Sequence, residues 1–216
     1  MHNHSEILKI TIEKAVNQLG LENRIDIISC ISYLEEMLLW NKTHGLTAIV
    51  EPHEMAIKHI ADSLSIYPFI QGQQLADIGT GAGLPGIPLA LLFPEKTFTL
   101  IESQNKKAAF LRHIKRILKL TNVNVIQHRV ETWEPLQRFD GIITRAFSSL
   151  SDMLLLTKHL CTDEGYFLAM KGGFPEEELA LIAKDYPHFE VKRLVVPELD
   201  AERHVVIINQ PNRSAQ

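Results

Sequence analysis

The chain has 216 residues, of which 45% are hydrophobic, so it can bury the core of one α/β domain with a modest extension. Its 22 Lys and Arg against 26 Asp and Glu give a net charge of -4, which excludes a global positive field that would attract nucleic acid or anionic lipid. The longest nearly uncharged apolar stretch, 85–94, is too short to span a bilayer, and the first residues lack a secretion-signal pattern. We therefore expect a cytoplasmic protein with no membrane partner.

The first part of the chain is expected to be helical. Between Ile7 and Leu64 the apolar residues recur at helical spacing, and no strand is needed there. Breaks at 20–23, at His44-Gly45 and at Pro52 divide the segment into about three helices. We predict that residues 1–66 are an N-terminal helical extension packed on the core.

From Gln74 onward, short apolar runs alternate with amphipathic helices, which is typical of a parallel sheet covered on both faces. The pattern predicts strands at 74–78, 97–101, 123–127, 140–143 and 165–170, and helices near 85–93, 104–119, 150–160 and 176–185. Two more β-rich runs, Val191 to Val196 and His204 to Ile208, leave no room for a helix between them and should pair as an antiparallel hairpin. We assign 67–210 to a Rossmann-like domain and 211–216 to a disordered tail.

The densest motif is the segment from Leu75 to Gly86, where an apolar strand runs into a glycine-rich turn and then a helix. Gly79, Gly81 and Gly83 lack Cβ atoms, so the backbone can turn tightly and approach a ligand closely. Gly81, Gly83 and Gly86 also satisfy G-x-G-x-x-G, the dinucleotide fingerprint. The spacing therefore leaves an NAD(P)-dependent oxidoreductase as an alternative.

Two features favour S-adenosylmethionine as the cofactor. Asp77, two residues before the first glycine, offers a carboxylate to a ligand that carries an ammonium and a sulfonium, whereas it would repel a pyrophosphate. The terminal hairpin is expected of a seven-stranded methyltransferase sheet, while a dinucleotide-binding fold would continue with parallel units. The predicted fold is thus that of a Rossmann-like class I methyltransferase dependent on S-adenosylmethionine.

Acidic and apolar residues after the next two strands are further candidates for cofactor binding. Glu102 ends a strand, where its carboxylate could accept both ribose hydroxyls, although such an acid is often a solvated loop residue. Val130, next to Glu131, could supply an apolar wall and a backbone donor to an adenine. A simple turn explains that segment nearly as well.

Two basic residues at strand ends are the catalytic candidates. Arg145 and Lys171 each directly follow an apolar strand. A charged side chain is unsuited to the core, so we expect both to lie at the edge of the sheet where ligands bind. Arg145 could contact the methionine carboxylate, an RNA phosphate or the target base, and either residue could be an ordinary strand-end charge. After the fourth strand the chain reads Thr144-Arg145-Ala146-Phe147, without the Asn/Asp-Pro-Pro-Tyr type of segment or a cysteine nucleophile. This pattern fits an atom with an exposed lone pair, such as guanine N7, for which alignment suffices.

The helix expected at 104–119 is strongly basic. Helical spacing turns Ala109, Ile117 and Leu120, with Phe110 or Ile114, toward the sheet. The remaining face carries positive charge without a single acid, which favours RNA contact over a solvated face. The RNA-binding candidates are Lys106, Lys107, Arg112 and Arg116. A non-catalytic RNA-binding module remains a second alternative.

Neither the cysteines nor the histidines indicate a metal. Cys30 and Cys161 are far apart and form no C-x-x-C, so we expect inert core thiols. His53-Glu54 is followed by His59 rather than by a histidine at the H-E-x-x-H position. We predict no metal site.

Over nearly its whole length the chain resembles the RsmG family, also called glucose-inhibited division protein B, which methylates 16S ribosomal RNA. The matching segments are Trp40-Asn41-Lys42, Leu46-Thr47, His59, Asp62-Ser63-Leu64, Asp77 to Pro88, Glu102-Ser103, Lys106-Lys107, Phe110-Leu111, Arg129-Val130-Glu131, Phe139-Asp140, Arg145-Ala146 and Lys171-Gly172. The combination is far more specific than any one segment. One departure is Gly45, because the family usually has Asn before Leu46-Thr47.

The resemblance implies transfer of a methyl group from S-adenosylmethionine to N7 of guanosine 527 in the 530 loop of 16S rRNA. The implied partner is 16S rRNA or the small ribosomal subunit, and the implied cofactor contacts are Gly79, Leu84, Val130, Glu131 and Arg145. We expect the protein to be a monomer.

Overall fold

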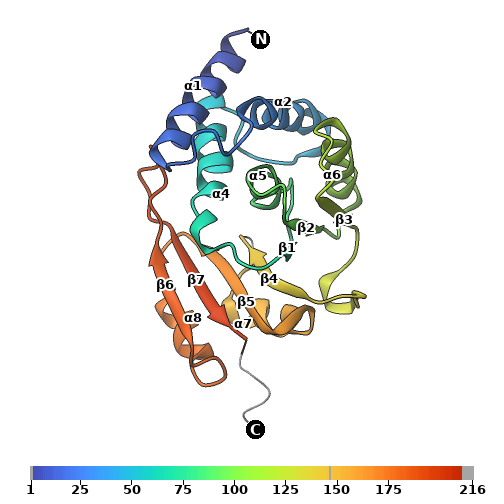
Figure 1. The fold of residues 1–216 in the computed structure, drawn as a ribbon, viewed down its shortest axis with the longest axis vertical. Coiled ribbons are helices and arrows are strands. Elements are labelled where there is room, and N and C mark those ends of the chain that lie inside the picture. Colours follow the sequence, from blue (N-terminus) through green and yellow to red (C-terminus); the bar gives the residue numbers. More distant parts are fainter. Residues whose placement is uncertain (1, 146, 211–216) are drawn as a thin grey trace.

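The computed structural model describes residues 2–145 and 147–210. The expected disordered tail, 211–216, and Ala146 of the family resemblance lie outside these residues. Within them the chain folds as an α/β protein around a seven-stranded sheet (Figure 1). None of the helices that the structure describes is long and apolar enough to cross a membrane.

Five parallel strands and an antiparallel pair form the sheet, in the order β3-β2-β1-β4-β5-β7-β6. The strands are β1 (Gln74–Ile78), β2 (Thr97–Ile101), β3 (Val123–Ile126), β4 (Phe139–Thr144), β5 (Cys161–Lys171), β6 (Phe189–Arg193) and β7 (His204–Asn209). The register aligns Ile78 with Ile101 and Ile101 with Ile126, so β1, β2 and β3 end level. The strand order reverses between β1 and β4, and the loops beyond their carboxyl ends meet at the edge where open α/β sheets bind ligands.

Helices cover both faces of this sheet (Figure 1). Side chains of β5 alternate between them: Leu168 and Met170 belong to one core cluster, and Phe167 and Ala169 to the other. The first cluster includes the N-terminal helices, α5 (Gly86–Leu92) and α6 (Asn105–Ile117), and the second includes α7 (Leu150–Thr157) and α8 (Glu176–Ile182). Short 3-10 turns lie at Tyr67–Phe69, Val130–Thr132 and Lys158–Leu160.

Three helical segments precede the sheet, as the sequence predicts. They are α1 (His2–Gln18), α2 (Ile27–His44) and a third helix composed of α3 (Pro52–Met55), a π-helical turn (Ala56–Ala61) and α4 (Asp62–Leu64). Asp26 caps α2 by accepting a 3.0 Å hydrogen bond from the Ile28 N–H. From the middle of α2, the buried Tyr33 hydroxyl donates to the carbonyl of Ala82 at 2.7 Å. The N-terminal helices therefore support the glycine-rich loop directly.

The terminal hairpin is confirmed, but its first strand lies earlier than the apolar pattern predicts. β6 spans Phe189–Arg193 rather than 191–196, and Val195 is exposed. β6 is the edge of the sheet and pairs only with β7, so polar residues such as Glu190 serve as well there as apolar ones. The run of valines therefore misplaces the strand by a few residues.

Candidate functional site

The glycine-rich loop connects β1 to α5 through backbone conformations that side chains rarely adopt. Gly79, Gly81 and Gly83 have φ angles of 65°, 61° and 102°. A Cβ added at Gly79 would meet no atom within 4 Å, and one at Gly81 would meet only the Gly79 carbonyl oxygen at 4.0 Å. Backbone conformation, not crowding, thus requires glycine at these two positions, and the space beside them is open to a ligand.

Gly83 and Leu84, both expected cofactor residues, support the loop from the core side. A Cβ at Gly83 would lie 2.6 Å from Ile87 Cγ1 and 3.3 Å from the Tyr33 hydroxyl oxygen. The Leu84 side chain is buried in the core cluster shared with the N-terminal helices. Neither residue lines the cavities described below.

Asp77, the last acid before the glycines, lies fully buried beneath the loop. Its Oδ2 accepts hydrogen bonds from the Thr80 hydroxyl at 2.6 Å and from the Gly86 N–H at 2.8 Å. Burial raises the pKa of Asp77 to about 6, although these hydrogen bonds and the nearby Arg145 act in the opposite direction. Its Oδ1 is buried without a hydrogen-bond partner among the described residues. The carboxylate shapes the loop and retains one acceptor that the protein does not satisfy.

A cavity of about 120 Å³, which we call the Gly79 cavity, opens beside this loop. It contains four of the residues expected to bind a cofactor, contributed by the loops after β1, β2 and β3. These four are Gly79, Glu102, Val130 and Glu131. Val130 is 8% exposed and provides an apolar wall, whereas Glu131 is exposed. The fold therefore brings these four predicted residues into one cavity, although Gly79 and Glu131 are 52 positions apart in the sequence.

Glu102 is held in place by backbone donors on two sides. Its Oε2 accepts from the Gly81 N–H at 3.1 Å, and its Oε1 accepts from the Gln104 N–H at 2.8 Å. The side chain is buried, so it is not the solvated loop acid of the alternative interpretation. Each oxygen still has a lone pair for a ligand hydroxyl.

A second cavity of about 330 Å³, the Arg145 pocket, contains both catalytic candidates. Arg145 follows β4 and Lys171 ends β5, so both approach from the sheet. The end of β5, the third helix with the loop before it, and the hairpin loop before β7 supply the rest of the lining. Four of the nine lining residues are lysine or arginine. The lining consists of Ile49, Lys58, His59, Asp62, Arg145, Met170, Lys171, Gly172 and Arg203.

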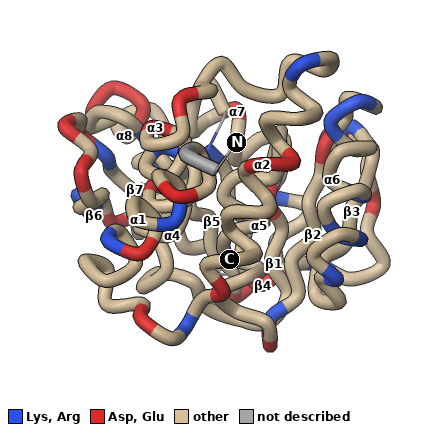
Figure 2. Tube along the Cα trace, turned by 90° about the horizontal axis from the view of Figure 1, so that it is seen from above, with Lys and Arg blue, Asp and Glu red and all other residues tan. Residues whose placement is uncertain are grey.

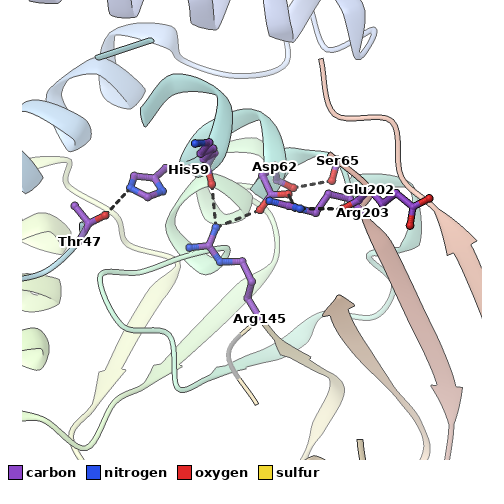
Figure 3. A network of polar contacts seen from close by, with 8 residues as sticks. Thr47, His59, Asp62, Ser65, Arg145, Glu202 and Arg203 are labelled. Carbon is purple, nitrogen blue, oxygen red and sulfur yellow. Dashed lines mark hydrogen bonds and ion pairs between the residues drawn. The ribbon is translucent and has the colours of Figure 1, made fainter. Parts of the chain in front are cut away.

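Carboxylates hold the cations of this pocket (Figure 3). Arg145 Nη1 donates to the Lys58 carbonyl at 3.1 Å and lies 3.3 Å from Asp62 Oδ2, while Arg203 Nε donates to Asp62 Oδ1 at 3.0 Å. Lys171 Nζ contacts both oxygens of Glu178, at 3.0 and 2.8 Å. The two catalytic candidates are therefore ordered before any substrate binds.

His59 lies in the wall of the Arg145 pocket as a neutral group. Its Nε2 is 3.0 Å from the Thr47 hydroxyl oxygen, and its Nδ1 is buried with no hydrogen-bond partner among the described residues (Figure 3). Burial lowers the pKa of His59 to about 4, and the positive charges of Arg145 and Lys58 act in the same direction. At neutral pH the ring can form hydrogen bonds without adding charge.

The departure at Gly45 has a conformational explanation. Gly45 caps the end of α2 with a φ of 59°, in the left-handed region that glycine and asparagine adopt most readily. The turn that follows is held by Asn41, whose Oδ1 accepts from the N–H groups of Leu46 and Thr47 at 2.6 and 3.0 Å. Gly45 can therefore replace the usual asparagine without disturbing Thr47.

The basic residues of helix α6 predicted to bind RNA line neither cavity. Lys106, Lys107, Arg112 and Arg116 are exposed or half-buried, and in the described part of the chain none of them is ion-paired with a carboxylate. Figure 2 shows the basic segments along this helix in blue. The predicted buried face was partly wrong: Ile117 is 44% exposed and Ala109 half-buried, whereas Ala108, Phe110, Leu111 and Ile114 are buried.

Several residues in the two cavities were missed by sequence reasoning. Phe147 and His128 line the Gly79 cavity, and Arg203 and Lys58 line the Arg145 pocket. Phe147 comes two residues after Arg145 and could have been chosen as an aromatic at the same sheet edge. Arg203 has no comparable local signal, because it lies in the hairpin loop, far from any motif.

The described histidine, cysteine and acidic side chains form neither a metal site nor a reactive thiol. Among the described residues, no group of three or more His, Cys, Asp or Glu side chains could hold a metal ion. Cys30 and Cys161 are buried free thiols, and burial raises the pKa of each to about 12. Neither can act as a thiolate nucleophile at neutral pH.

Comparison with solved structures identifies the fold. The chain superposes on a SAM-dependent methyltransferase from Aquifex aeolicus with a TM-score of 0.54 and 20% identity, covering 72% of this chain and 93% of that one. It also superposes on M. jannaschii TYW2 in complex with AdoMet, with a TM-score of 0.51 and 20% identity, covering 69% and 73%. The expected fold, a class I methyltransferase, is confirmed.

Comparison with known sequences gives the family. The family model for GidB, rRNA small subunit methyltransferase G, matches residues 26–206. Ribosomal RNA small subunit methyltransferase G from Photobacterium profundum and from Escherichia coli K12 are each 46% identical over 178 residues, or 82% of this chain and 86% of theirs. These matches confirm the expectation of S-adenosylmethionine as cofactor and remove the basis of the dinucleotide alternative. The chain belongs to the GidB family of rRNA small subunit methyltransferase G proteins.

Proposed function

We propose that the protein transfers the methyl group of S-adenosylmethionine to N7 of guanosine 527 in the 530 loop of 16S rRNA. The observation that carries this proposal is the pairing of the Gly79 cavity with the cationic Arg145 pocket at one edge of the sheet. The printed names of the relatives, small-subunit rRNA methyltransferases, support the class of substrate. The family resemblance supports guanosine 527, and the segment Thr144-Arg145-Ala146-Phe147 after β4 also favours an atom with an exposed lone pair, such as N7.

The Gly79 cavity fits the cofactor chemically. Glu102 offers carboxylate lone pairs for the ribose hydroxyls, Val130 an apolar wall for the adenine, and Gly79 an open backbone. The unsatisfied Oδ1 of Asp77 adds a buried negative acceptor under the loop, which suits a cationic ligand. When bound there, S-adenosylmethionine supplies an electrophilic methyl group on sulfur.

The groups of the Arg145 pocket suit binding and orientation of an RNA nucleotide rather than proton transfer. Arg145 and Lys171 are cations that recognise phosphate or base acceptors, and His59 is neutral at physiological pH. Guanine N7 has an exposed lone pair, so no base need remove a proton before attack. Catalysis by this chain then consists of aligning the lone pair with the methyl carbon and excluding water.

Helix α6 provides the wider RNA contact in this proposal. Each lysine or arginine that neutralises a phosphate releases a counterion, so binding weakens steeply with salt. We expect Arg112→Ala to weaken RNA binding a few-fold and to reduce the slope of log affinity against log salt by about one. Lys184→Ala, an exposed cation beyond α8, is the matched control and leaves both unchanged.

The decisive experiment uses small subunits from cells that lack the endogenous modification. Purified protein with labelled S-adenosylmethionine is incubated with these particles and, separately, with bare 16S rRNA, and the product is cleaved chemically at 7-methylguanosine. The proposal predicts one cleavage site, at nucleotide 527. Label at another nucleotide overturns the assignment of the site. RNA binding without cofactor binding would instead support a non-catalytic RNA-binding module.

A further inference from the structure

One carboxylate links two arginines that are distant in sequence. Asp62 is 83 residues from Arg145 and 141 from Arg203, yet each of its oxygens contacts one guanidinium group (Figure 3). Its side chain is 5% exposed, whereas those of Arg145 and Arg203 are 27% and 26% exposed. The acid is therefore buried beneath two cations that reach the pocket surface.

The two guanidinium groups keep donors that the protein does not use. Arg145 donates only through Nη1, and Arg203 only through Nε and Nη1, to partners in the described part of the chain. A ligand in the pocket can thus receive hydrogen bonds from Arg145 Nε and Nη2 and from Arg203 Nη2. His59 lines the same wall, but its unpaired Nδ1 is buried, so these donors come from the two arginines.

We propose that Asp62 is a positioning residue that holds Arg145 and Arg203 together as a clamp for a phosphate of the substrate RNA. The inference deepens the proposed function, on which its choice of RNA as the ligand rests. Two guanidinium groups this close repel each other unless a carboxylate lies between them. With both oxygens of Asp62 engaged, the remaining donors form a fixed fork that matches the oxygens of a phosphate.

The local helix geometry supports this role. Asp62 directly follows the π-helical turn Ala56–Ala61, and such irregular turns are frequent at functional sites. The same turn aligns the Lys58 carbonyl with Arg145 Nη1, at 3.1 Å. Arg145 is thus fixed by two acceptors from one helix that lies far from it in sequence.

Substituting Asp62→Asn separates positioning from simple electrostatics. The change removes the only acid that lines the Arg145 pocket among the described residues, so the pocket becomes more positive. If charge alone mattered, the variant would bind an anion more tightly. Positioning predicts the opposite: we expect the affinity for inorganic pyrophosphate, measured by calorimetry on the full chain, to fall at least tenfold.

Arg203→Gln provides a second route that leaves the buried acid in place and removes one of its two cations. We expect it to weaken pyrophosphate binding by a similar factor, and the double variant with Asp62→Asn to be no more than about twofold weaker than either single variant. The matched control is Asp163→Asn, because Asp163 forms an exposed ion pair with Arg138 outside the pocket. The control leaves pyrophosphate binding unchanged, and all variants keep the wild-type affinity for S-adenosylmethionine as evidence of folding.

The outcomes distinguish this inference from the proposed function. Tighter pyrophosphate binding by Asp62→Asn, multiplying losses in the double variant, or no binding by the wild-type protein overturns the clamp. Methyl transfer to RNA can still be intact in that case, and the proposed function then survives. If pyrophosphate behaves as expected but the wild-type protein methylates no 16S rRNA, the clamp remains and the choice of RNA as its ligand is wrong.

Discussion

The Gly79 cavity and the Arg145 pocket lie at the same edge of the sheet but are assembled differently. The first is formed by the successive connections after β1, β2 and β3, with Phe147 added after β4, so its lining residues all come from 78–147. The second combines the third N-terminal helix, the ends of β4 and β5, and the hairpin loop before β7. A cavity made from consecutive units can be recognised from a short motif, whereas one made from distant segments requires the tertiary structure.

Their electrostatics differ as well. The Gly79 cavity is lined by two acids, Glu102 and Glu131, and one arginine, Arg129. The Arg145 pocket is lined by four lysines and arginines and one acid, Asp62. This division suits a cationic cofactor on one side and an anionic RNA on the other. If it is correct, substitutions in the two cavities should affect different ligands.

The largest effect is expected from Arg145→Ala. If Arg145 makes the proposed charge-assisted hydrogen bonds to the substrate, each contributing about 1.5–3 kcal/mol, its removal should lower kcat/KM for methyl transfer about 100-fold. Affinity for S-adenosylmethionine, measured by calorimetry, should change less than about twofold. Arg138→Ala, an exposed arginine outside both cavities, is the control. An equal loss of cofactor affinity would show that Arg145 serves both cavities and would break the division.

A smaller effect is expected from Glu102→Gln, which should weaken binding of the cofactor and not of the RNA. The amide keeps the shape of the side chain but lacks the charge that strengthens hydrogen bonds to the ribose. Its NH2 group also cannot accept from the Gly81 or Gln104 N–H, so affinity for S-adenosylmethionine should fall about tenfold. RNA affinity, measured by fluorescence anisotropy, should stay the same. Glu164→Gln, an exposed acid on β5, is the control. Unchanged cofactor affinity would mean that Glu102 does not contact the ribose.

The smallest effect at neutral pH concerns Asp77. Burial raises the pKa of Asp77 from 3.8 to about 6. The protonated form therefore stabilises the folded state fully below pH 3.8, and this stabilisation is lost as the pH rises through about 6. A cationic cofactor favours the ionised form, so its affinity should fall about tenfold per pH unit below pH 6 and level off above it. Asp77→Asn should flatten this profile in calorimetry from pH 5 to 8. A flat wild-type profile contradicts the coupling.

Much of the fold could be predicted because its signals are local. The bounds of β1 and β2 follow from apolar runs that end in glycine or acid, and the hairpin follows from the lack of a connecting helix. The edge strand β6 was misplaced, because an edge strand needs no apolar pattern. In α6, Ile117 was assigned to the buried face but is the last residue of the helix and is 44% exposed.

The sequence by itself determined the glycine-rich loop, the alternation of strands and helices and the family, because these depend on backbone conformation and periodicity within short segments. Only the tertiary structure decided that Asp77 is buried beneath the loop, that Gly83 is needed for packing against Tyr33, and that Asp62 holds Arg145 beside Arg203. Burial and ion pairing depend on which distant segments meet, and no local pattern encodes that meeting.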